Sequence, residues 1–245
     1  MNKKTIVITG GNSGIGFECA NYLLKNNYDV IITGRNESKL ESALKKLGNS
    51  AKGYLVDAGD LRQIDNWVHS LKSEGVEIDG LFINAGVFLA ANFESTTEDI
   101  FDSTMNVNFK GPFFTIQKIL PLMNNPSSIV LNTSIVVFKA FKNTSIYTSS
   151  KAALESLSNV LNVELAPRGI RTNIISPGIT KTPILEKAGM SKEDVDELMK
   201  NLESSLPIGR SVLPTDIAPI LGFLMSDKSL VLRNEKIIVD GGSTL

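Results

Sequence analysis

Short apolar runs alternate with helix-length segments along all 245 residues. The runs expected to form strands are Thr5–Thr9, Val30–Thr33, Lys52–Val56, Gly80–Ile83, Ile129–Leu131, Arg171–Ile175 and Lys236–Val239. The expected helices are about Gly14–Asn26, Glu37–Leu47, Leu61–Ser73, Thr97–Asn106, Gly111–Met123, Ser145–Ala166 and Thr215–Met225. Apolar strands separated by crossover helices must be covered on both sides. The alternation therefore predicts an α/β fold: a doubly wound parallel sheet of about seven strands with helices on both faces.

No repeat or linker divides the chain, so residues 1–245 are expected to form a single domain. One segment, Thr182–Pro207, is more polar than the rest and breaks the alternation. We expect it to be an insertion with one or two short helices that forms a lid over a site.

Composition excludes several classes of function. A formal net charge of −1 gives no field that would attract nucleic acid or an anionic membrane. Cys19 is the only cysteine and no targeting segment is recognised, so a cytoplasmic location is expected. With His69 as the only histidine, a zinc site of the usual His/Cys kind is not expected, and no metal is predicted. His69 lies in a polar helical stretch and is expected at the surface.

The first expected strand runs into a glycine-rich turn, Gly10-Gly11-Asn12-Ser13-Gly14-Ile15-Gly16, and a helix follows. Glycines allow a tight turn and a close approach of backbone to phosphate, and a helix N-terminus offers free N–H groups to an anion. The spacing Gly-x-x-x-Gly-x-Gly differs from the Gly-x-Gly-x-x-Gly fingerprint. A ligand-free turn is the alternative, but the place between first strand and first helix favours nucleotide binding.

The second expected strand is followed by Gly34 and Arg35, where an NAD-binding fold usually has an acidic residue for the ribose 2′-hydroxyl. A carboxylate repels a 2′-phosphate, whereas an arginine fork binds it with charge-assisted hydrogen bonds. This favours NADP over NAD. The alternative is that Arg35 only begins the next helix as a solvated charge, and Ser13 offers no second cation.

Tyr147 and Lys151 are four residues apart on an expected helix, so they share one face. Ser134 lies thirteen residues before the tyrosine, where a strand ends. A hydroxyl facing a phenol, with an ammonium one turn behind it, can move a proton to or from a carbonyl oxygen. A solvated Tyr-Lys pair on a helix surface is the alternative, so the pair depends on the rest of the chain for its interpretation.

Together these features resemble the short-chain dehydrogenase/reductase family, in particular the branch of about 250 residues with 3-oxoacyl-carrier-protein reductases and ketone reductases. The resemblance extends from Lys4 to Gly242. It rests on the glycine turn, Asp57, Asn84-Ala85-Gly86, Asn108, Ser134, Tyr147, Lys151, Pro177-Gly178, Thr182 and Val239-Asp240-Gly241-Gly242. Two departures concern the usual glycine before the last strand, replaced around Leu232-Arg233-Asn234, and the bulky residues that follow Ser134.

The resemblance implies a Rossmann fold and hydride transfer between nicotinamide and a carbonyl or secondary alcohol carbon. It implies a catalytic tetrad of Asn108, Ser134, Tyr147 and Lys151. Tyr147 would be the acid/base, Lys151 would favour its phenolate and bind the nicotinamide ribose, Ser134 would stabilise charge on the substrate oxygen, and Asn108 would anchor a water. The implied cofactor contacts are Gly10, Asn12, Ser13, Gly14, Ile15, Gly16, Arg35, Asp57, Ala58, Asn84, Ala85, Gly86, Tyr147, Lys151, Pro177, Gly178, Thr180 and Thr182.

The resemblance also implies a homotetramer, or a homodimer, built on the helices around Gly111–Met123 and Ser145–Ala166 and on the C-terminal strand. The expected partner is a small carbonyl or alcohol substrate, with an acyl thioester as a further class. An apolar pocket is suggested by Phe88, Leu89, Ile135 to Phe138, Ile184, Leu185 and Met190, although each residue is also consistent with core packing. An anionic substrate or carrier could be met by Lys139, Lys142, Lys181 and Lys187, although scattered lysines usually form a solvated face.

Three alternatives remain beside an NADP-dependent reductase. The first is an NAD-dependent alcohol or polyol dehydrogenase of the same family. The second is a dinucleotide-sensing regulator without activity, which would not need the Tyr147-Lys151 pair. The third is an epimerase or dehydratase, which would have a longer C-terminal region and different glycine spacing.

Overall fold

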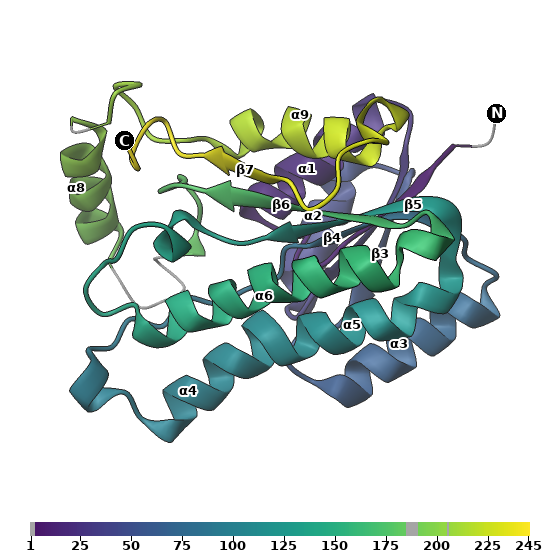
Figure 1. Cartoon of the computed structure of the whole chain (residues 1–245), viewed down its shortest axis with the longest axis horizontal. Helices are drawn as coiled ribbons and strands as arrows, with labels where there is room; N and C mark the ends of the chain where they lie inside the picture. Colours follow the sequence, from purple (N-terminus) through teal and green to yellow (C-terminus); the bar gives the residue numbers. More distant parts are fainter. Residues whose placement is uncertain (1–2, 185–190, 205) are drawn as a thin grey trace.

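A sheet of seven parallel strands forms the centre of the computed structural model, which describes residues 3–184, 191–204 and 206–245 (Figure 1). The strand order is β3-β2-β1-β4-β5-β6-β7. The strands are β1 (Thr5–Ile8), β2 (Asp29–Gly34), β3 (Ala51–Leu55), β4 (Ile78–Ile83), β5 (Met123–Asn132), β6 (Arg171–Pro177) and β7 (Lys236–Val239). Each overlaps one of the seven predicted runs, and the predicted parallel α/β fold is confirmed.

The helices lie between the strands, as the alternation predicted. They are α1 (Gly14–Lys25), α2 (Glu37–Leu47), α3 (Leu61–Ser73), α4 (Glu98–Met105), α5 (Gly111–Ile119), α6 (Ser145–Glu164), α8 (Lys192–Glu203) and α9 (Pro214–Met225). The prediction of one helix over Gly111–Met123 was wrong at its end: α5 stops at Ile119 and a 3₁₀ turn, Leu120–Leu122, leads into β5. Pro121 explains the change, since a proline inside a helix removes a hydrogen bond and clashes with the preceding turn.

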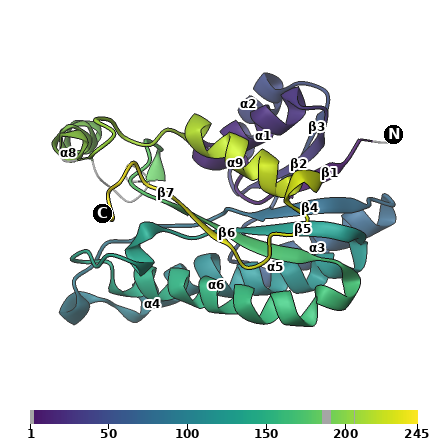
Figure 2. The ribbon, with the colours of Figure 1, turned by 45° about the horizontal axis from the view of Figure 1, so that its top comes forward.

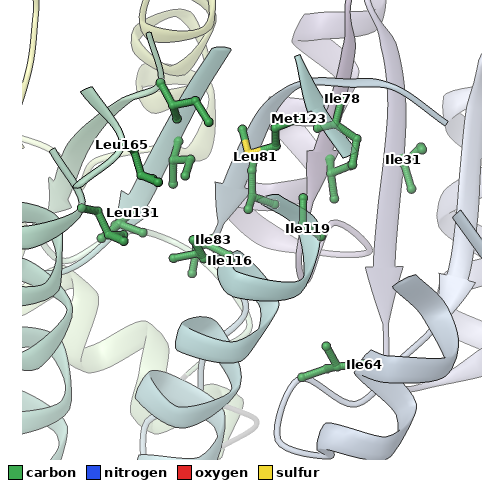
Figure 3. Close-up of a cluster of buried hydrophobic side chains, with 14 of the residues drawn as sticks. Ile31, Ile64, Ile78, Leu81, Ile83, Ile116, Ile119, Met123, Leu131 and Leu165 are labelled. Carbon is green, nitrogen blue, oxygen red and sulfur yellow. The ribbon is translucent and has the colours of Figure 1, made fainter. Parts of the chain in front are cut away.

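Helices cover both faces of the sheet. Figure 2 shows α1, α2 and α9 on one side and α3, α5 and α6 on the other. Each side has its own buried cluster, in which strand residues pack against the helices. The cluster on the α1 and α9 side includes Cys19, Leu23 and Leu221, and the cluster on the α3, α5 and α6 side includes Ile64 and Trp67. The second cluster is drawn in Figure 3, where Ile116 and Ile119 of α5 lie beside Leu81 and Ile83 of β4. The core therefore consists of two apolar layers, one on each face of the sheet.

The order of the strands places a cleft at one edge of the sheet. From β1 the chain first winds outward to β2 and β3 and later returns to β4 on the other side of β1. A crevice forms where the winding reverses, outside the carboxyl ends of the strands. There the Thr9 hydroxyl after β1 accepts hydrogen bonds from the backbone N–H of Asn84 at 2.9 Å and of Ala85 at 3.0 Å, after β4. This joins the two segments that flank the reversal.

The predicted insertion Thr182–Pro207 contains one described helix, α8. Residues 185–190 and 205 lie outside the described residues, so Leu185, Lys187 and Met190 are not placed.

The structure shows how the chain replaces the glycine that the family usually has before the last strand. Asn234 takes a positive φ of 58° before β7. Asparagine tolerates this left-handed conformation better than most residues, which explains how the chain replaces the usual glycine. Within the described residues, every helix is too short or too polar to cross a membrane.

Gly111, the first residue of α5, lets this helix approach the segment after β3. A Cβ at this position would overlap the backbone carbonyl of Ala58. We expect Gly111→Ala to lower the free energy of unfolding by about 2 kcal/mol or more, because backbone rather than a flexible side chain must move. Urea unfolding followed by circular dichroism measures the loss.

The control is Gly75→Ala, where the added Cβ meets no atom within 4 Å and only the positive φ of 66° opposes it. A positive φ of this size costs a residue with a Cβ about 1–2 kcal/mol. Equal losses in the two variants would show that the contact between Gly111 and Ala58 does not limit packing.

Candidate functional site

One continuous cleft of about 1030 Å³ runs along the carboxyl edge of the sheet. Nearly all the predicted site residues line it. They are Gly10, Asn12, Ser13, Gly14, Ile15, Arg35, Asp57, Ala58, Asn84, Ala85, Gly86, Ser134, Tyr147, Lys151, Pro177, Gly178, Thr180 and Thr182. Gly16 and Asn108 are the two predicted residues behind its wall, and both are buried. The structure thus brings together residues that are up to 172 positions apart, from Gly10 to Thr182.

The glycine turn forms the floor of one part of the cleft. Gly10 and Gly14 have φ values of 65° and 57°, in the left-handed region that favours glycine. Gly16 is required by packing, because a Cβ there would contact the Asn84 amide and the Gly10 carbonyl oxygen at 2.5 Å. The first turn of α1 has no acidic residue, so its N-terminal N–H groups face the cleft without an opposing charge. This donor set fits the pyrophosphate of a dinucleotide.

Two cations and one carboxylate line the end of the cleft beside β2 and β3. Arg35 follows β2 directly and Lys39 lies in the first turn of α2, while Asp57 follows β3. The Asn36 side chain caps α2 by accepting from the Lys39 N–H at 3.0 Å. Lys39 was missed in the sequence. The signal was a second cation in the first turn of the helix that begins just after Arg35.

The Asn84-Ala85-Gly86 segment forms the middle of the cleft. The Asn84 side chain donates to the carbonyl oxygens of Thr9 at 2.9 Å and Gly10 at 3.2 Å, which fixes the glycine turn against β4. It also accepts from the Asn132 amide at 2.9 Å, at the end of β5. One side chain therefore joins the ends of β1, β4 and β5.

Ser134, Tyr147 and Lys151 meet at the opposite end of the cleft from Arg35. Tyr147 on α6 is 9% exposed, and its phenol hydrogen-bonds the Ser134 hydroxyl. The Phe88 ring packs edge-on against the Tyr147 ring, with centroids 5.0 Å apart. Burial raises the pKa of Tyr147 to about 12, and the hydrogen bond from Ser134 opposes the rise. Lys151, which the resemblance expects to favour the phenolate, does not lower this pKa, because burial is the dominant cause.

Lys151 is buried at 4% exposure, one helical turn from Tyr147. Its ammonium lies 5.8 Å from the centroid of the Tyr147 ring and donates to the carbonyl oxygen of Asn132 at 2.8 Å. Burial lowers its pKa to about 8. Asn132 was not singled out in the sequence, since its contribution is a backbone carbonyl, which any residue provides. At neutral pH the pair therefore holds an ammonium beside a neutral phenol.

Asn108 lies in a π-helical turn, Asn106–Lys110, between α4 and α5. Its side chain accepts from the Val87 N–H at 2.8 Å and donates to the Val87 carbonyl at 2.9 Å and the Ser150 hydroxyl at 3.1 Å. Both ends of this amide are thus used to hold the segment after Gly86 against α6. π-Helical turns inside helices are frequent at functional sites.

Apolar side chains form the wall beyond Tyr147. The residues from the predicted pocket that line the cleft are Phe88, Leu89, Ile135, Val136 and Ile184; Phe141 and Leu198 are added by the structure. Val137 and Phe138 do not line it, because the 3₁₀ turn Ile135–Val137 carries them away from the cleft. Of the three predicted lysines that the structure describes, Lys142 alone lines the cleft, whereas Lys139 donates to the Ser243 carbonyl at 2.7 Å. Lys181 is exposed outside the lining.

The C-terminal Asp240-Gly241-Gly242 motif supports the cleft from outside. The Asp240 carboxylate accepts from the Gly242 N–H at 2.9 Å and from the Thr244 N–H and hydroxyl. Gly178 packs directly on it, since a Cβ on Gly178 would lie 2.7 Å from the Asp240 Cα. The motif therefore holds Pro177 and Gly178 in place as one side of the cleft. Among the described residues, the histidine, cysteine and acidic side chains form no cluster that could hold a metal ion.

Comparisons with known proteins cover nearly the whole chain. A family model, adh_short_C2, described as enoyl-(acyl carrier protein) reductase, matches residues 10–244. The oxidoreductase YxbG of Bacillus subtilis is 31% identical over 99% of this chain and 91% of that protein. A short-chain dehydrogenase/reductase of Caenorhabditis elegans, solved with cofactor, superposes with a TM-score of 0.92, 28% identity, and coverage of 98% and 95% of the two chains. A 3-ketoacyl-(acyl-carrier-protein) reductase of Brucella melitensis, complexed with NADH, gives a TM-score of 0.88 at 26% identity, with 99% and 98% covered.

The buried ammonium of Lys151 predicts a particular dependence of stability on pH. Its pKa in the folded chain is about 8, below the ordinary value of 10.5, so between these pH values the unfolded chain binds more protons. The contribution of Lys151 to the free energy of unfolding therefore rises with pH through this window, by about 3 kcal/mol in full. We expect Lys151→Met to lose this rise, so that its stability relative to wild type is highest at neutral pH.

Urea unfolding of both proteins at neutral pH and near pH 10 measures the difference. Lys45→Met, which replaces an exposed lysine of α2, is the control and should follow wild type at every pH. Parallel curves for wild type and Lys151→Met would contradict the assignment of a lowered pKa to Lys151.

Proposed function

The chain belongs to the short-chain dehydrogenase/reductase family, and on that premise we propose that it is an NADP(H)-dependent reductase of a ketone or related carbonyl compound. The observation that carries this proposal is the position of Tyr147. Its buried phenol, hydrogen-bonded to Ser134, stands at one end of a cleft whose other part is a glycine-lined floor. A proton donor and a dinucleotide-binding surface thus share one cavity.

In this proposal each residue of the site has a separate task. A nicotinamide bound in the cleft supplies the hydride. Tyr147 gives its proton to the carbonyl oxygen, and Ser134 donates a hydrogen bond to the same oxygen as negative charge develops there. The Lys151 ammonium, held at the Asn132 carbonyl, stabilises the phenolate that remains on Tyr147. Asn108 positions the backbone beside Gly86, whose missing side chain leaves space next to the Lys151 ammonium.

The pKa of Tyr147 supports the reducing direction. With a pKa of about 12 the phenol is protonated at neutral pH, and a carbonyl reduction needs a proton donor at this place. Oxidation of an alcohol would instead need the phenolate as a base. The apolar wall of Phe88, Leu89 and Phe141 favours substrates with an apolar group beside the carbonyl. Lys142 at the rim is compatible with an acyl thioester or another anionic substrate.

Arg35 and Lys39 support NADP(H) as the preferred cofactor. Both line the end of the cleft beside β2, and β2 ends at Gly34 with no carboxylate to repel a 2′-phosphate. Lys39 provides the second cation that the glycine turn lacks. NAD(H) is the second candidate, because the Brucella melitensis relative was solved with NADH. An NAD-dependent alcohol or polyol dehydrogenase would then be the corresponding function.

The quaternary structure and the lid belong to the same proposal. Phe113 on α5 and Val160 and Val163 on α6 are exposed apolar residues, which supports a homotetramer or homodimer that packs these helices together.

The lid is supported by a contact with the glycine turn. Thr182 and Pro183 lie directly over Gly14, since a Cβ on Gly14 would be 3.3 Å from the Thr182 side chain. This contact supports the assignment of the segment from Thr182 as a lid over the glycine turn.

Tyr147→Phe tests the catalytic role. The substitution keeps the ring that packs against Phe88 and removes only the hydroxyl. We expect turnover with NADPH to fall by about a thousandfold or more. General acid catalysis is typically worth 10²–10⁴-fold, and phenylalanine has no hydroxyl that could donate the proton. Binding of NADPH, followed by protein fluorescence, should stay within about threefold of wild type.

The assay follows NADPH oxidation with a panel of ketones and 3-oxoacyl thioesters. Tyr28→Phe, far from the cleft lining, is the matched control and should retain turnover. If Tyr147→Phe kept near-normal turnover, Tyr147 would not be the proton donor. If wild type bound NADPH and reduced nothing, the regulator without activity would become the better explanation.

Thermal shifts with NADPH and NADH test the cofactor preference. A ligand at a hundredfold its Kd stabilises the folded chain by about 2.7 kcal/mol, enough to raise Tm by several degrees. We expect NADPH to give the larger shift with wild type. Arg35→Ala and Lys39→Ala should each weaken NADPH binding by about tenfold or more, the effect of losing one charge-assisted hydrogen bond, and leave NADH binding unchanged.

Lys45→Ala, an exposed lysine of the same helix outside the cleft lining, is the control for nonspecific charge effects. A larger shift with NADH, or no effect of Arg35→Ala, would refute the 2′-phosphate assignment and favour the NAD-dependent alternative.

A further inference from the structure

Three successive turns of α6 bind three successive residues at the end of β5. Tyr147 hydrogen-bonds Ser134, and Lys151 donates to the Asn132 carbonyl at 2.8 Å. One turn further, the Glu155 carboxylate accepts from the Thr133 hydroxyl at 3.2 Å. The spacing of 147, 151 and 155 keeps all three side chains on one face of the helix. The proposed mechanism uses the first two contacts and gives no role to Glu155.

Glu155 is a buried carboxylate with both oxygens occupied. The residue is 4% exposed. One oxygen accepts from Thr133, and the other accepts from the Lys236 ammonium on β7 at 2.7 Å. Burying a charge without a partner is strongly unfavourable, so this carboxylate depends on Lys236. The Lys236 side chain itself is 37% exposed and stays partly hydrated.

Lys236 also contacts the segment that follows Ser134. Its ammonium lies over the Phe138 ring, 5.9 Å from the centroid. On the other side of Ser134, the Thr133 hydroxyl also lies 2.7 Å from the Ser176 hydroxyl of β6. The ion pair and its partners therefore hold Ser134 from both directions along the chain, through Thr133 before it and Phe138 after it.

We propose that Glu155 and Lys236 are positioning residues for the catalytic centre: Glu155 fixes the strand end that carries Ser134, and Lys236 cancels its charge. The proposal rests on the proposed function, because it assumes that Ser134, Tyr147 and Lys151 act in catalysis. It concerns how their geometry and charge are kept, and neither Glu155 nor Lys236 itself lines the cleft.

The charges around the centre give this arrangement a distinct consequence. Among the described residues, the charged side chains lining the cleft besides Lys151 are Lys142 before α6 and, at the far end, Arg35, Lys39 and Asp57. Glu155 on α6 and Lys236 on β7 complete the surroundings as a neutral pair. Without Lys236 an unpaired carboxylate would remain one turn from Lys151. A nearby negative charge favours the ammonium and disfavours the phenolate, so the pKa values of Lys151 and Tyr147 would both rise.

The experiment compares Lys236→Met, Glu155→Gln and the double variant with wild type. Lys45→Met and Glu41→Gln, exposed on α2, are the controls for loss of the same charges. The readouts are kcat and KM for the best carbonyl compound of the ketone and thioester panel over a range of pH, the Kd of NADPH, and Tm. An ultraviolet titration of tyrosinate, taken as the difference from Tyr147→Phe, follows the phenol without substrate.

We expect Lys236→Met to lower kcat by about tenfold and to shift both the pH profile of kcat and the tyrosinate titration upward by about half a unit or more, within the range of coupling through a hydrogen-bond and ion-pair network. The Kd of NADPH should stay within about twofold. Glu155→Gln in the Lys236→Met background removes the unpaired charge and should return the pH profile towards wild type. The amide of glutamine can still accept from Thr133, which preserves the contact to the strand end.

Equal Tm losses with unchanged kcat and pH profile in all three variants would overturn the proposal and leave a purely structural ion pair. A double variant whose pH profile stays shifted like that of Lys236→Met would also overturn it. Tyr147→Phe separates this outcome from failure of the proposed function. If Tyr147→Phe is inactive while the Glu155 and Lys236 variants behave as wild type, only the positioning role is wrong.

Discussion

The hydrogen bond from the Lys151 ammonium to the Asn132 carbonyl is the contact on which the site depends. Burying the charge of a lysine that is 4% exposed is unfavourable unless the ammonium donates to an acceptor. Here the acceptor is the backbone carbonyl of Asn132, the last residue of β5. The bond sets how α6 lies on the sheet edge, and Tyr147 one turn away is placed with it. Helix and strand are thus aligned by a buried charge rather than by apolar packing alone, which has no preferred direction.

The parallel sheet explains why such a contact can exist. Parallel strands covered on both faces leave only their ends free for polar groups, and all carboxyl ends lie on the same edge. Thr9, Asn84 and Asn132 occupy three of these ends and bond one another, so the edge is an ordered polar surface bounded by apolar layers. Side chains from distant parts of the sequence meet there because the winding order of the strands brings those ends side by side.

Residue patterns predicted the fold, and together with the family resemblance they predicted most of the cleft. The alternation of apolar runs predicted all seven strands, since strand burial is a local property of the sequence. The glycine turn and the Tyr147-Lys151 spacing were also local signals. Other features depend on register and could not be seen in the sequence: Lys236 meets Glu155 across 81 residues, and Phe138 leaves the pocket because a 3₁₀ turn follows Ser134. The pKa of Tyr147 likewise depends on burial, which opposes the simple effect of a neighbouring ammonium.

The two sides of the cleft differ in how they are built. The groups proposed for proton transfer are carried by β5 and α6 and bonded to the sheet edge. The apolar wall beyond Tyr147 comes mainly from connecting segments, including those with Phe88, Leu89 and Phe141. Loops tolerate replacement far better than the elements they connect. Substrate selectivity in such a molecule can therefore be changed by exchanging or mutating the loops of the apolar wall. The groups on β5 and α6 that are proposed for proton transfer can stay the same.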